Sequence, residues 1–290
     1  MLILSVDGGG VRGMLTAALL LRLESRLPGW LQHVDLYAGA STGALIALGL
    51  AHGLTPMEVF EFYRNRLPEI FEQSWWRRWT TLWRAKYTSD ALRKNLDEIF
   101  GDETMGSLKT DCLVATYFLG SEEPYEPARS RFYDRTDEDL RIADVALWSG
   151  SAPTYFPSAD RHVDGGLAAN NSAVCAMAYA ENKGTLLSEM KVLSLGTGRH
   201  SAVLEGGDKG LTYWGQKLLI PFVDGSVDVA HYQASTFLKS EGTYHRVQPN
   251  LVEEIDLDDV SRLDDLIDFA NQVDLDPTIE WITQQVGPVT

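Results

Sequence analysis

The sequence predicts an α/β fold in which helices flank a central, mostly parallel sheet as a three-layer α/β/α arrangement. Strand-like and helix-like segments alternate along the chain, as they do when helices connect parallel strands. Glycine-rich turns follow the first two strand-like runs, and each turn opens a helix-like run. With 290 residues, 44% of them hydrophobic, the chain is long enough to bury a large core.

The expected strands are short apolar runs bounded by turn-forming or charged residues. They span residues 2–7, 34–39, 111–119, 161–164, 191–196 and 243–248. A helix-like run of residues 14–27 lies between the first two of them.

Two further helices have clear start or stop signals. Thr55 and Glu58 form a capping-box pattern, with Pro56 at the first helical position. A later helix begins near Asp90 and stops at Gly101.

The segment Gly39-Ala40-Ser41-Thr42-Gly43 has the Gly-x-Ser-x-Gly pattern of a nucleophile elbow. Such an elbow holds its serine on a sharp strand-to-helix turn, and the flanking glycines allow strand and helix to approach closely. Ser41 would then lie at a helix N-terminus, where the helix dipole favours developing negative charge. The same string also fits an ordinary turn with a capping serine.

A second glycine-rich segment, Asp7-Gly8-Gly9-Gly10-Val11-Arg12-Gly13, ends the first strand. Its backbone N–H groups are a source of donors for an oxyanion. The segment also fits the G-x-G-x-x-G pattern of dinucleotide-binding folds. That pattern requires an acidic residue at the end of the next strand, where this chain has Ser41.

A third segment, Asp164-Gly165-Gly166, follows the fourth expected strand. An aspartate at a strand end, followed by two glycines, can reach a cleft unobstructed by its neighbours. Taken alone, the segment is more typical of an ordinary Asp-Gly turn.

Taken in chain order, residues 7–13, 39–43 and 164–166 resemble the signature set of the patatin-like phospholipases. Residues 151–157, 170–171 and 193–198 agree with the same family, and the resemblance covers roughly residues 2–200. It implies a patatin-like fold and a lipid acyl hydrolase of the phospholipase A or lysophospholipase type.

The resemblance also implies roles for individual residues. Ser41 would be the nucleophile and Asp164 the general base of a Ser-Asp dyad. The oxyanion would be held by the loop residues Gly8, Gly9, Gly10 and Arg12. The remaining motif residues are Gly13, Gly39, Gly43, Gly165 and Gly166. The resemblance implies no cofactor and no metal.

Two alternatives stay open at this point. An α/β-hydrolase-like esterase would use a Ser-His-Asp triad, for which the histidines after Asp164 are His200, His231 and His245. A non-catalytic α/β module would use the glycine loop to bind an anion or a nucleotide.

Charge argues against nucleic acid as a partner. The chain carries a net charge of −16, which phosphate backbones would repel. Residues 250–290 hold eleven acidic residues and one arginine, and Val260, Leu263, Leu266 and Ala270 recur at helical spacing. We therefore expect an acidic helical segment over residues 251–290, packed on a catalytic domain of residues 1–250.

A Trp/Arg-rich stretch lies in a helical insertion expected at about residues 55–105. Its tryptophans, interleaved with basic residues, are Trp75, Trp76, Trp79 and Trp83. Tryptophan and arginine both favour the bilayer interface, so this stretch predicts peripheral contact with a lipid membrane. A core or subunit contact is the alternative.

The remaining features predict a cytoplasmic protein that acts on acyl lipids at the membrane. The two cysteines, Cys112 and Cys175, are too few for a disulfide framework. Met1 leads directly into the first strand, and no apolar run approaches the length of a transmembrane helix. Bacterial patatin-like proteins include both stand-alone hydrolases and effectors switched on by cyclic nucleotides. The motifs are the same in both, so a cyclic-nucleotide activator stays undecided.

Overall fold

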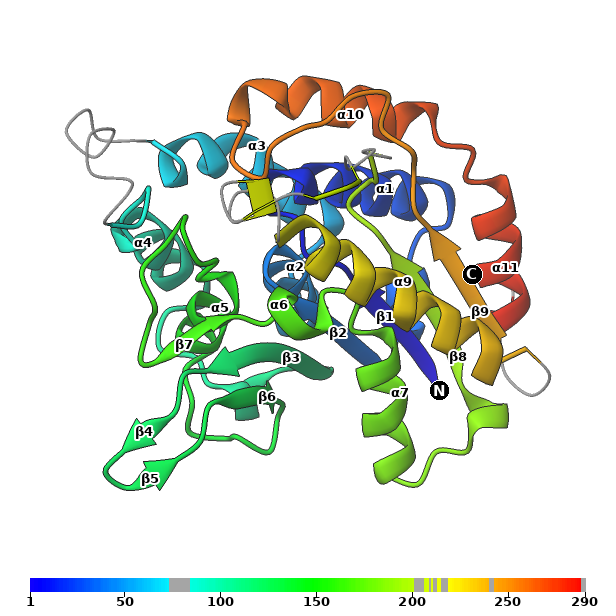
Figure 1. Cartoon of the computed structure of the whole chain (residues 1–290). Coiled ribbons are helices and arrows are strands. Elements are labelled where there is room, and N and C mark those ends of the chain that lie inside the picture. The colour runs from blue at the N-terminus through cyan, green and yellow to red at the C-terminus, as the bar shows by residue number, and fades with distance from the viewer. Residues whose placement is uncertain are drawn as a thin grey trace.

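The computed structural model describes residues 1–72, 84–200, 206–208, 210, 213–214, 219–239 and 243–287. In this part of the chain the main sheet has seven strands. Six of them lie in the order β6 (Arg129–Tyr133), β3 (Asp111–Phe118), β2 (Leu36–Ala40), β1 (Leu2–Val6), β8 (Lys191–Leu195) and β9 (Thr243–Val247). The seventh, β7 (His162–Asp164), pairs with β3. Figure 1 shows the arrangement.

The sheet is mostly parallel, as predicted. The four pairings β1–β2, β1–β8, β2–β3 and β8–β9 are parallel, whereas β6 and β7 run antiparallel to β3. The six predicted strands are all present. The sequence prediction missed β6, as well as the two-residue strands β4 (Ser121–Glu122) and β5 (Tyr125–Glu126), which pair with each other.

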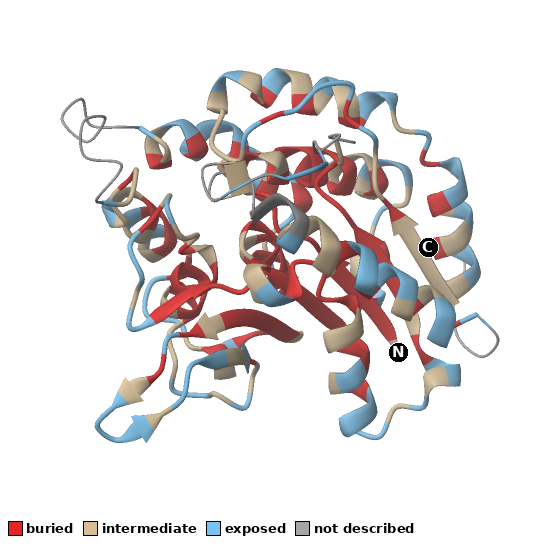
Figure 2. Cartoon of the chain, in the orientation of Figure 1, coloured by how far each residue is buried: buried red, intermediate tan, exposed pale blue. Residues whose placement is uncertain are grey.

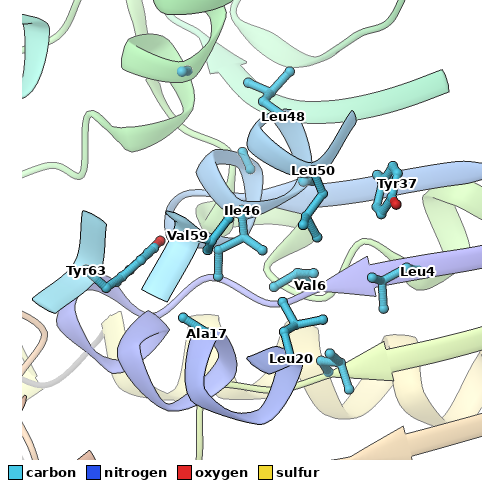
Figure 3. Close-up of a cluster of buried hydrophobic side chains, with 14 of the residues drawn as sticks. Leu4, Val6, Ala17, Leu20, Tyr37, Ile46, Leu48, Leu50, Val59 and Tyr63 are labelled. Carbon is cyan, nitrogen blue, oxygen red and sulfur yellow. The ribbon is translucent and has the colours of Figure 1, made fainter. Parts of the chain in front are cut away.

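Alternate residues of β1 face two different cores, which makes the fold three-layered as predicted. Leu4 and Val6 belong to the larger core, together with α1 (Gly13–Arg26), α2 (Thr42–His52) and α5 (Ile142–Gly150). Ile3 belongs to the smaller core, which contains α7 (Ala173–Asn182) and the end of α9 (Leu219–Phe237). Figure 3 shows side chains of β1, α1 and α2, including Leu4, Leu20 and Ile46, gathered in the larger core.

The helix signals in the sequence are confirmed at residue level. At α3 (Pro56–Ile70) the Glu58 N–H donates to Thr55 Oγ1 over 3.2 Å, and the Thr55 N–H donates to Glu58 Oε2 over 2.7 Å. Helix α4 (Asp90–Phe100) ends at Gly101, whose φ of 54° is the left-handed backbone that glycine adopts readily. Short 3-10 turns cover Gly10–Arg12, Trp30–His33, Met105–Ser107, Leu187–Glu189 and Val260–Arg262.

The acidic C-terminal residues form two helices, α10 (Leu263–Gln272) and α11 (Asp276–Val286). Leu266 and Ala270 of α10 are fully buried, so the predicted helix with one apolar face is confirmed. Arg22 of α1 donates hydrogen bonds to the carbonyls of Ala270 and Val273. Figure 2 shows the exposed outer side of these helices and the buried strands beneath the helical layers.

Neither a disulfide nor a membrane-spanning helix is found among the described residues. Cys112 lies buried in β3 and Cys175 lies in α7, and neither is in a disulfide. No helix in the described ranges has both the length and the apolar run needed to cross a bilayer.

Candidate active site

Ser41 lies in a sharp turn between β2 and α2. Its backbone has φ 55° and ψ −129°, a conformation that residues with a side chain rarely adopt and that costs about 1–3 kcal/mol. A side chain at Gly43 would overlap the carbonyl oxygen of Val6, so α2 can approach β1 this closely only with glycine there. The predicted elbow is therefore present in its geometry.

A buried serine on α5 supports this turn. The Ser41 N–H donates to Ser149 Oγ over 2.9 Å, and Ser149 Oγ donates in turn to the Ala115 carbonyl of β3 over 2.7 Å. Ser149 is fully buried. The sequence analysis did not single it out, because nothing near Ser149 in the chain points to a partner 108 residues away.

The register of β3 brings Asp164 to Ser41. Ala40, the residue before Ser41, pairs with Ala115 of β3. Asp164 pairs with the next residue of β3, Thr116, while β6 occupies the opposite edge of β3. Strand β7 therefore lies just beyond the end of β2, and Asp164 and Ser41 line one cavity.

The environment of Asp164 makes its carboxyl group a stronger base than an exposed aspartate. Burial raises the pKa of Asp164 to about 6, against the opposing effect of hydrogen bonds from the Ser41 side chain and the Gly166 N–H. The bond from the Gly166 N–H to Asp164 Oδ1 measures 2.7 Å. Asp164 is 5% exposed. Its carboxylate is thus ionised at neutral pH and has two donors.

The backbone N–H groups of the glycine loop after β1 differ in their hydrogen bonding. The Gly8 N–H is occupied, since it donates to the Asn170 carbonyl over 3.1 Å, and the Gly8 carbonyl accepts from Thr197 Oγ1 over 2.9 Å. Within the described residues, the N–H groups of Gly9 and Gly10 have no hydrogen-bond acceptor. The expected loop is there, but Gly8 serves as its anchor rather than as a free donor.

The other predicted motif residues lie in or directly beside the elements that carry the loop, Ser41 and Asp164. Arg12 lines the Ser41 cavity and also a smaller polar pocket that it shares with Asp224 and His200. Gly13 is the first residue of α1, Gly39 lies inside β2, and Gly165 and Gly166 follow Asp164.

The C-terminal segment contacts the loop directly. The Val11 N–H donates to the Leu257 carbonyl over 2.8 Å. Gly10 has φ 58°, and a side chain there would overlap the same carbonyl oxygen. Leu257 therefore closes one side of the glycine loop, a role that its sequence context does not signal.

An ion pair buried below the loop holds its first residue. Arg246 of β9 donates to both carboxylate oxygens of Asp7, over 2.6 Å and 3.3 Å, and to Ser194 Oγ over 2.6 Å. Both side chains of the pair are nearly fully buried. Because a buried charge needs its partner, this pair fixes the strand end from which the loop starts.

The cavity that contains Ser41 is polar at one end and apolar elsewhere. We call it the Ser41 cavity. Its polar end is lined by Gly9, Gly10, Arg12, Ser41 and Asp164. Its apolar walls are lined by Leu45, Leu67, Ile70, Phe71, Leu92, Pro153, Tyr155, Phe156, Leu167, Val223 and Leu257. Such a cavity suits a ligand with a long apolar part and one reactive polar group.

The histidines that an α/β-hydrolase triad would need lie elsewhere. His231 contacts the Tyr244 hydroxyl, His245 contacts Thr278 Oγ1, and His200 lines the smaller polar pocket. No histidine is among the described residues that line the Ser41 cavity.

The described residues contain no group of three or more His, Cys, Asp or Glu side chains placed to hold a metal ion. Trp75, Trp76, Trp79 and Trp83, predicted to contact the membrane, lie outside the residues that the structure describes.

Comparison with known proteins gives a family match and several relatives. A family model described as patatin-like phospholipase matches residues 4–176. A cGAMP-activated phospholipase of Pseudomonas aeruginosa is 33% identical, with 73% of this chain and 68% of that protein covered. Patatin-like protein 2 of Arabidopsis thaliana is 26% identical, with 93% and 82% covered.

More distant matches include a mammalian enzyme and a solved structure. The 85/88 kDa calcium-independent phospholipase A2 of Mus musculus is 29% identical, with 69% of this chain and 28% of that protein covered. VipD from Legionella pneumophila is 14% identical with a TM-score of 0.41, and the match covers 92% of this chain and 66% of that one.

Proposed function

Since the chain belongs to the patatin-like phospholipase family, a family of serine ester hydrolases, we propose that it hydrolyses carboxylic esters of membrane lipids with Ser41 as nucleophile and Asp164 as general base. One observation carries the proposal. A serine in a strained elbow and an aspartate with a pKa of about 6 line the polar end of one otherwise apolar cavity.

The reaction proceeds in two halves. Ser41 Oγ attacks the ester carbonyl carbon while its proton passes to the Asp164 carboxylate. The tetrahedral intermediate then collapses, and the leaving alcohol takes that proton from Asp164. A water molecule attacks the acyl-enzyme and gives a proton to Asp164, after which the fatty acid leaves and Ser41 recovers its proton.

The raised pKa of Asp164 supports its role as base. An aspartate with the ordinary pKa of about 3.9 accepts a proton from an alcohol poorly. At a pKa of about 6 the carboxylate is a stronger base that is still ionised at neutral pH. Its hydrogen bonds from Ser41 and Gly166 orient it toward the serine.

The N–H groups of Gly9 and Gly10, which have no acceptor among the described residues, support an oxyanion hole beside Ser41. In comparable acyl-transfer sites, one such donor stabilises the transition state by about 3–4 kcal/mol. The positive end of α2, which begins directly after Ser41, adds to this stabilisation. Arg12 adds a positive charge at the same end of the cavity.

The apolar walls of the Ser41 cavity indicate that the cavity binds the acyl chain of the substrate. Aliphatic side chains from α2, α3 and α4 line it, together with the aromatic side chains of Phe71, Tyr155 and Phe156. Each methylene buried there contributes about 0.8 kcal/mol to binding. A phospholipid or lysophospholipid would place its ester at Ser41 and its head group toward solvent.

The site does not favour the alternatives. A triad requires a histidine beside Ser41, and the described lining of the cavity contains none. A dinucleotide site requires an acidic residue at the end of β2, where the chain has Ser41.

Hydrolysis of a mixed lipid extract tests the proposal, with released fatty acids measured by mass spectrometry. The wild type should release fatty acids, whereas Ser41→Ala and Asp164→Asn should lower the rate by several orders of magnitude. Turnover retained by Ser41→Ala would contradict the proposal. Turnover retained by Asp164→Asn alone would move the base to another group.

Membrane contact and domain organisation are parts of the same proposal. The Trp/Arg-rich stretch would contact the bilayer, and residues 251–290 would belong to one domain with residues 1–250. Replacement of Trp75, Trp76, Trp79 and Trp83 by serine should abolish liposome binding and leave hydrolysis of a short soluble ester intact. Unchanged liposome binding would refute the membrane contact.

A further inference from the structure

A second apolar pocket lies behind the Ser41 cavity. It is lined by Leu45, Leu54, Val59, Phe62, Tyr63, Leu96, Ile99 and Phe100. Of these residues, only Leu45 also lines the Ser41 cavity. The Leu45 side chain is thus the shared wall between the two spaces.

Leu45 lies one helical turn from the nucleophile. Its N–H donates to the Ser41 carbonyl over 3.2 Å, within the first turn of α2. Its neighbours Ala44 and Ile46 are fully buried, whereas Leu45 is only partly buried. An interior side chain of this kind borders open space instead of packing on all sides.

Two residues complete the wall. A Cβ built on Gly150, the last residue of α5, would lie 3.5 Å from Leu92 Cδ2 and 3.6 Å from Leu45 Cδ1. Gly150, Leu92 and Leu45 therefore meet at one place, and all three line the Ser41 cavity. They form its floor on the side of the second pocket.

We propose that Leu45 ends the acyl-binding part of the Ser41 cavity and sets the length of the acyl chain that the enzyme accepts, with Gly150 keeping the approach to it open. This inference rests on the proposed function. The second pocket is the space that a longer acyl chain would enter if the Leu45 side chain were removed.

Packing arguments support this assignment. Replacing Leu45 by alanine would remove three side-chain carbons from the shared wall and join the two apolar spaces. Cavities that stay empty are apolar, and they bind apolar molecules. Each additional methylene that a substrate buries there raises kcat/KM about fourfold.

Competition among substrates tests the inference. The enzyme is incubated with an equimolar mixture of saturated straight-chain p-nitrophenyl esters, from butanoate to octadecanoate, in a constant excess of detergent. Mass spectrometry of the released acids gives relative kcat/KM values that do not depend on the fraction of active enzyme. We expect Leu45→Ala to shift the preference to longer chains by several carbons, with at least a tenfold gain over wild type for the longest esters relative to butanoate.

A variant that should shift the chain-length preference in the opposite direction gives an independent readout. Gly150→Val adds methyl groups at the floor without replacing Leu45, so we expect its preference to shift to shorter chains. Gly150→Ala is its matched control, because the added Cβ has ordinary van der Waals contacts and should leave the preference unchanged.

The outcomes separate this inference from the proposed function. Ester hydrolysis that does not depend on Ser41 would refute the proposed function. Ser41-dependent hydrolysis with the wild-type chain-length preference in Leu45→Ala would overturn the inference alone. If Leu45→Ala does not fold, an unshifted preference in Gly150→Val overturns it equally.

Discussion

The backbone N–H of Ser41 donates a 2.9 Å hydrogen bond to the side-chain hydroxyl of Ser149, which lies 108 residues later in the chain. The Ser149 hydroxyl in turn donates a hydrogen bond to the Ala115 carbonyl of β3. The Ser149 hydroxyl thus links the Ser41 turn to β3. Asp164 pairs with Thr116, the residue of β3 that follows Ala115. The positions of nucleophile and base are coupled through β3 and α5.

We predict that Ser149→Ala lowers both stability and kcat. The change leaves the Ser41 N–H and the Ala115 carbonyl without their partner, which costs about 1–3 kcal/mol. Because the turn is strained, its relaxation should move Ser41 and lower kcat by about tenfold to a hundredfold. Urea unfolding and ester hydrolysis measure the two effects.

Ser151→Ala is the matched control. Ser151 is also fully buried, but its hydroxyl donates to the Leu147 carbonyl at the end of α5. It should lose stability by about 1 kcal/mol and keep kcat. Equal losses of kcat in the two variants would show that Ser149 has no particular role at the turn.

The pH dependence of catalysis should report the pKa of Asp164. Burial raises this pKa to about 6. Below that value Asp164 takes up a proton and no longer accepts one from Ser41. We therefore expect kcat/KM to fall tenfold per pH unit below about pH 6 and to reach a plateau above it. An acid limb centred near pH 4 would mean that a carboxyl group with an ordinary pKa is the base.

The same shift predicts a gain in stability for Asp164→Asn at neutral pH. The carboxyl ionises near 3.8 in the unfolded chain and near 6 in the folded protein. Its contribution to stability is therefore complete below pH 4 and is lost as the pH rises through 6. This loss amounts to about 3 kcal/mol.

Asparagine stays neutral at every pH and keeps an acceptor for the Gly166 N–H. The stability of Asp164→Asn relative to wild type should thus rise between pH 4 and pH 7. Urea unfolding of both proteins at the two pH values measures this difference. The other carboxyl groups are the same in both proteins, so their pH-dependent contributions to stability cancel. A difference that does not change with pH would contradict the raised pKa.

Local sequence patterns were enough to predict the parts of this fold that depend on local physics. The strand runs, the capping box at Thr55 and the stop at Gly101 all depend on residues a few positions apart, and all were found. The elbow at Ser41 is of the same kind, because its glycines lie within two residues of the serine.

Residues whose roles arise from long-range contacts were not predictable in this way. Ser149, Arg246 and Leu257 meet the elbow and the loop only after the chain has folded, and nothing beside them in the sequence points to those distant partners. Strand β6 was missed because two of the five residues in Arg129-Ser-Arg-Phe-Tyr133 are arginines and only Tyr133 is buried. Its place in the sheet comes from antiparallel pairing with β3.

Gly10→Ala should disable the glycine loop. Gly10 has φ 58°, and an added methyl group would overlap the Leu257 carbonyl, so the loop and the C-terminal segment would have to move apart. We expect kcat to fall by about a hundredfold or more, since the Gly9 and Gly10 donors would shift.

Gly101→Ala is a control with similar backbone strain. Gly101 has φ 54°, and an added methyl group would lie in open space. Its cost should be about 1 kcal/mol of stability with no loss of kcat. If Gly10→Ala were as mild as Gly101→Ala, the contact with Leu257 would not matter for the loop.

The buried pair of Asp7 and Arg246 gives a prediction with an internal control. Arg246→Met removes one partner and leaves the Asp7 carboxylate buried without a counter-charge, which should cost about 3–5 kcal/mol. Asp7→Asn removes the other partner and leaves the Arg246 guanidinium uncompensated. In the double variant no charge is stranded, so its loss should be smaller than the sum of the two single losses by about 2 kcal/mol or more. Urea unfolding of the four proteins measures this coupling.

Because Asp7 directly precedes Gly8, both single variants should also lose kcat through the loop. Additive losses in the double-mutant cycle would mean that the ion pair does not hold the strand end.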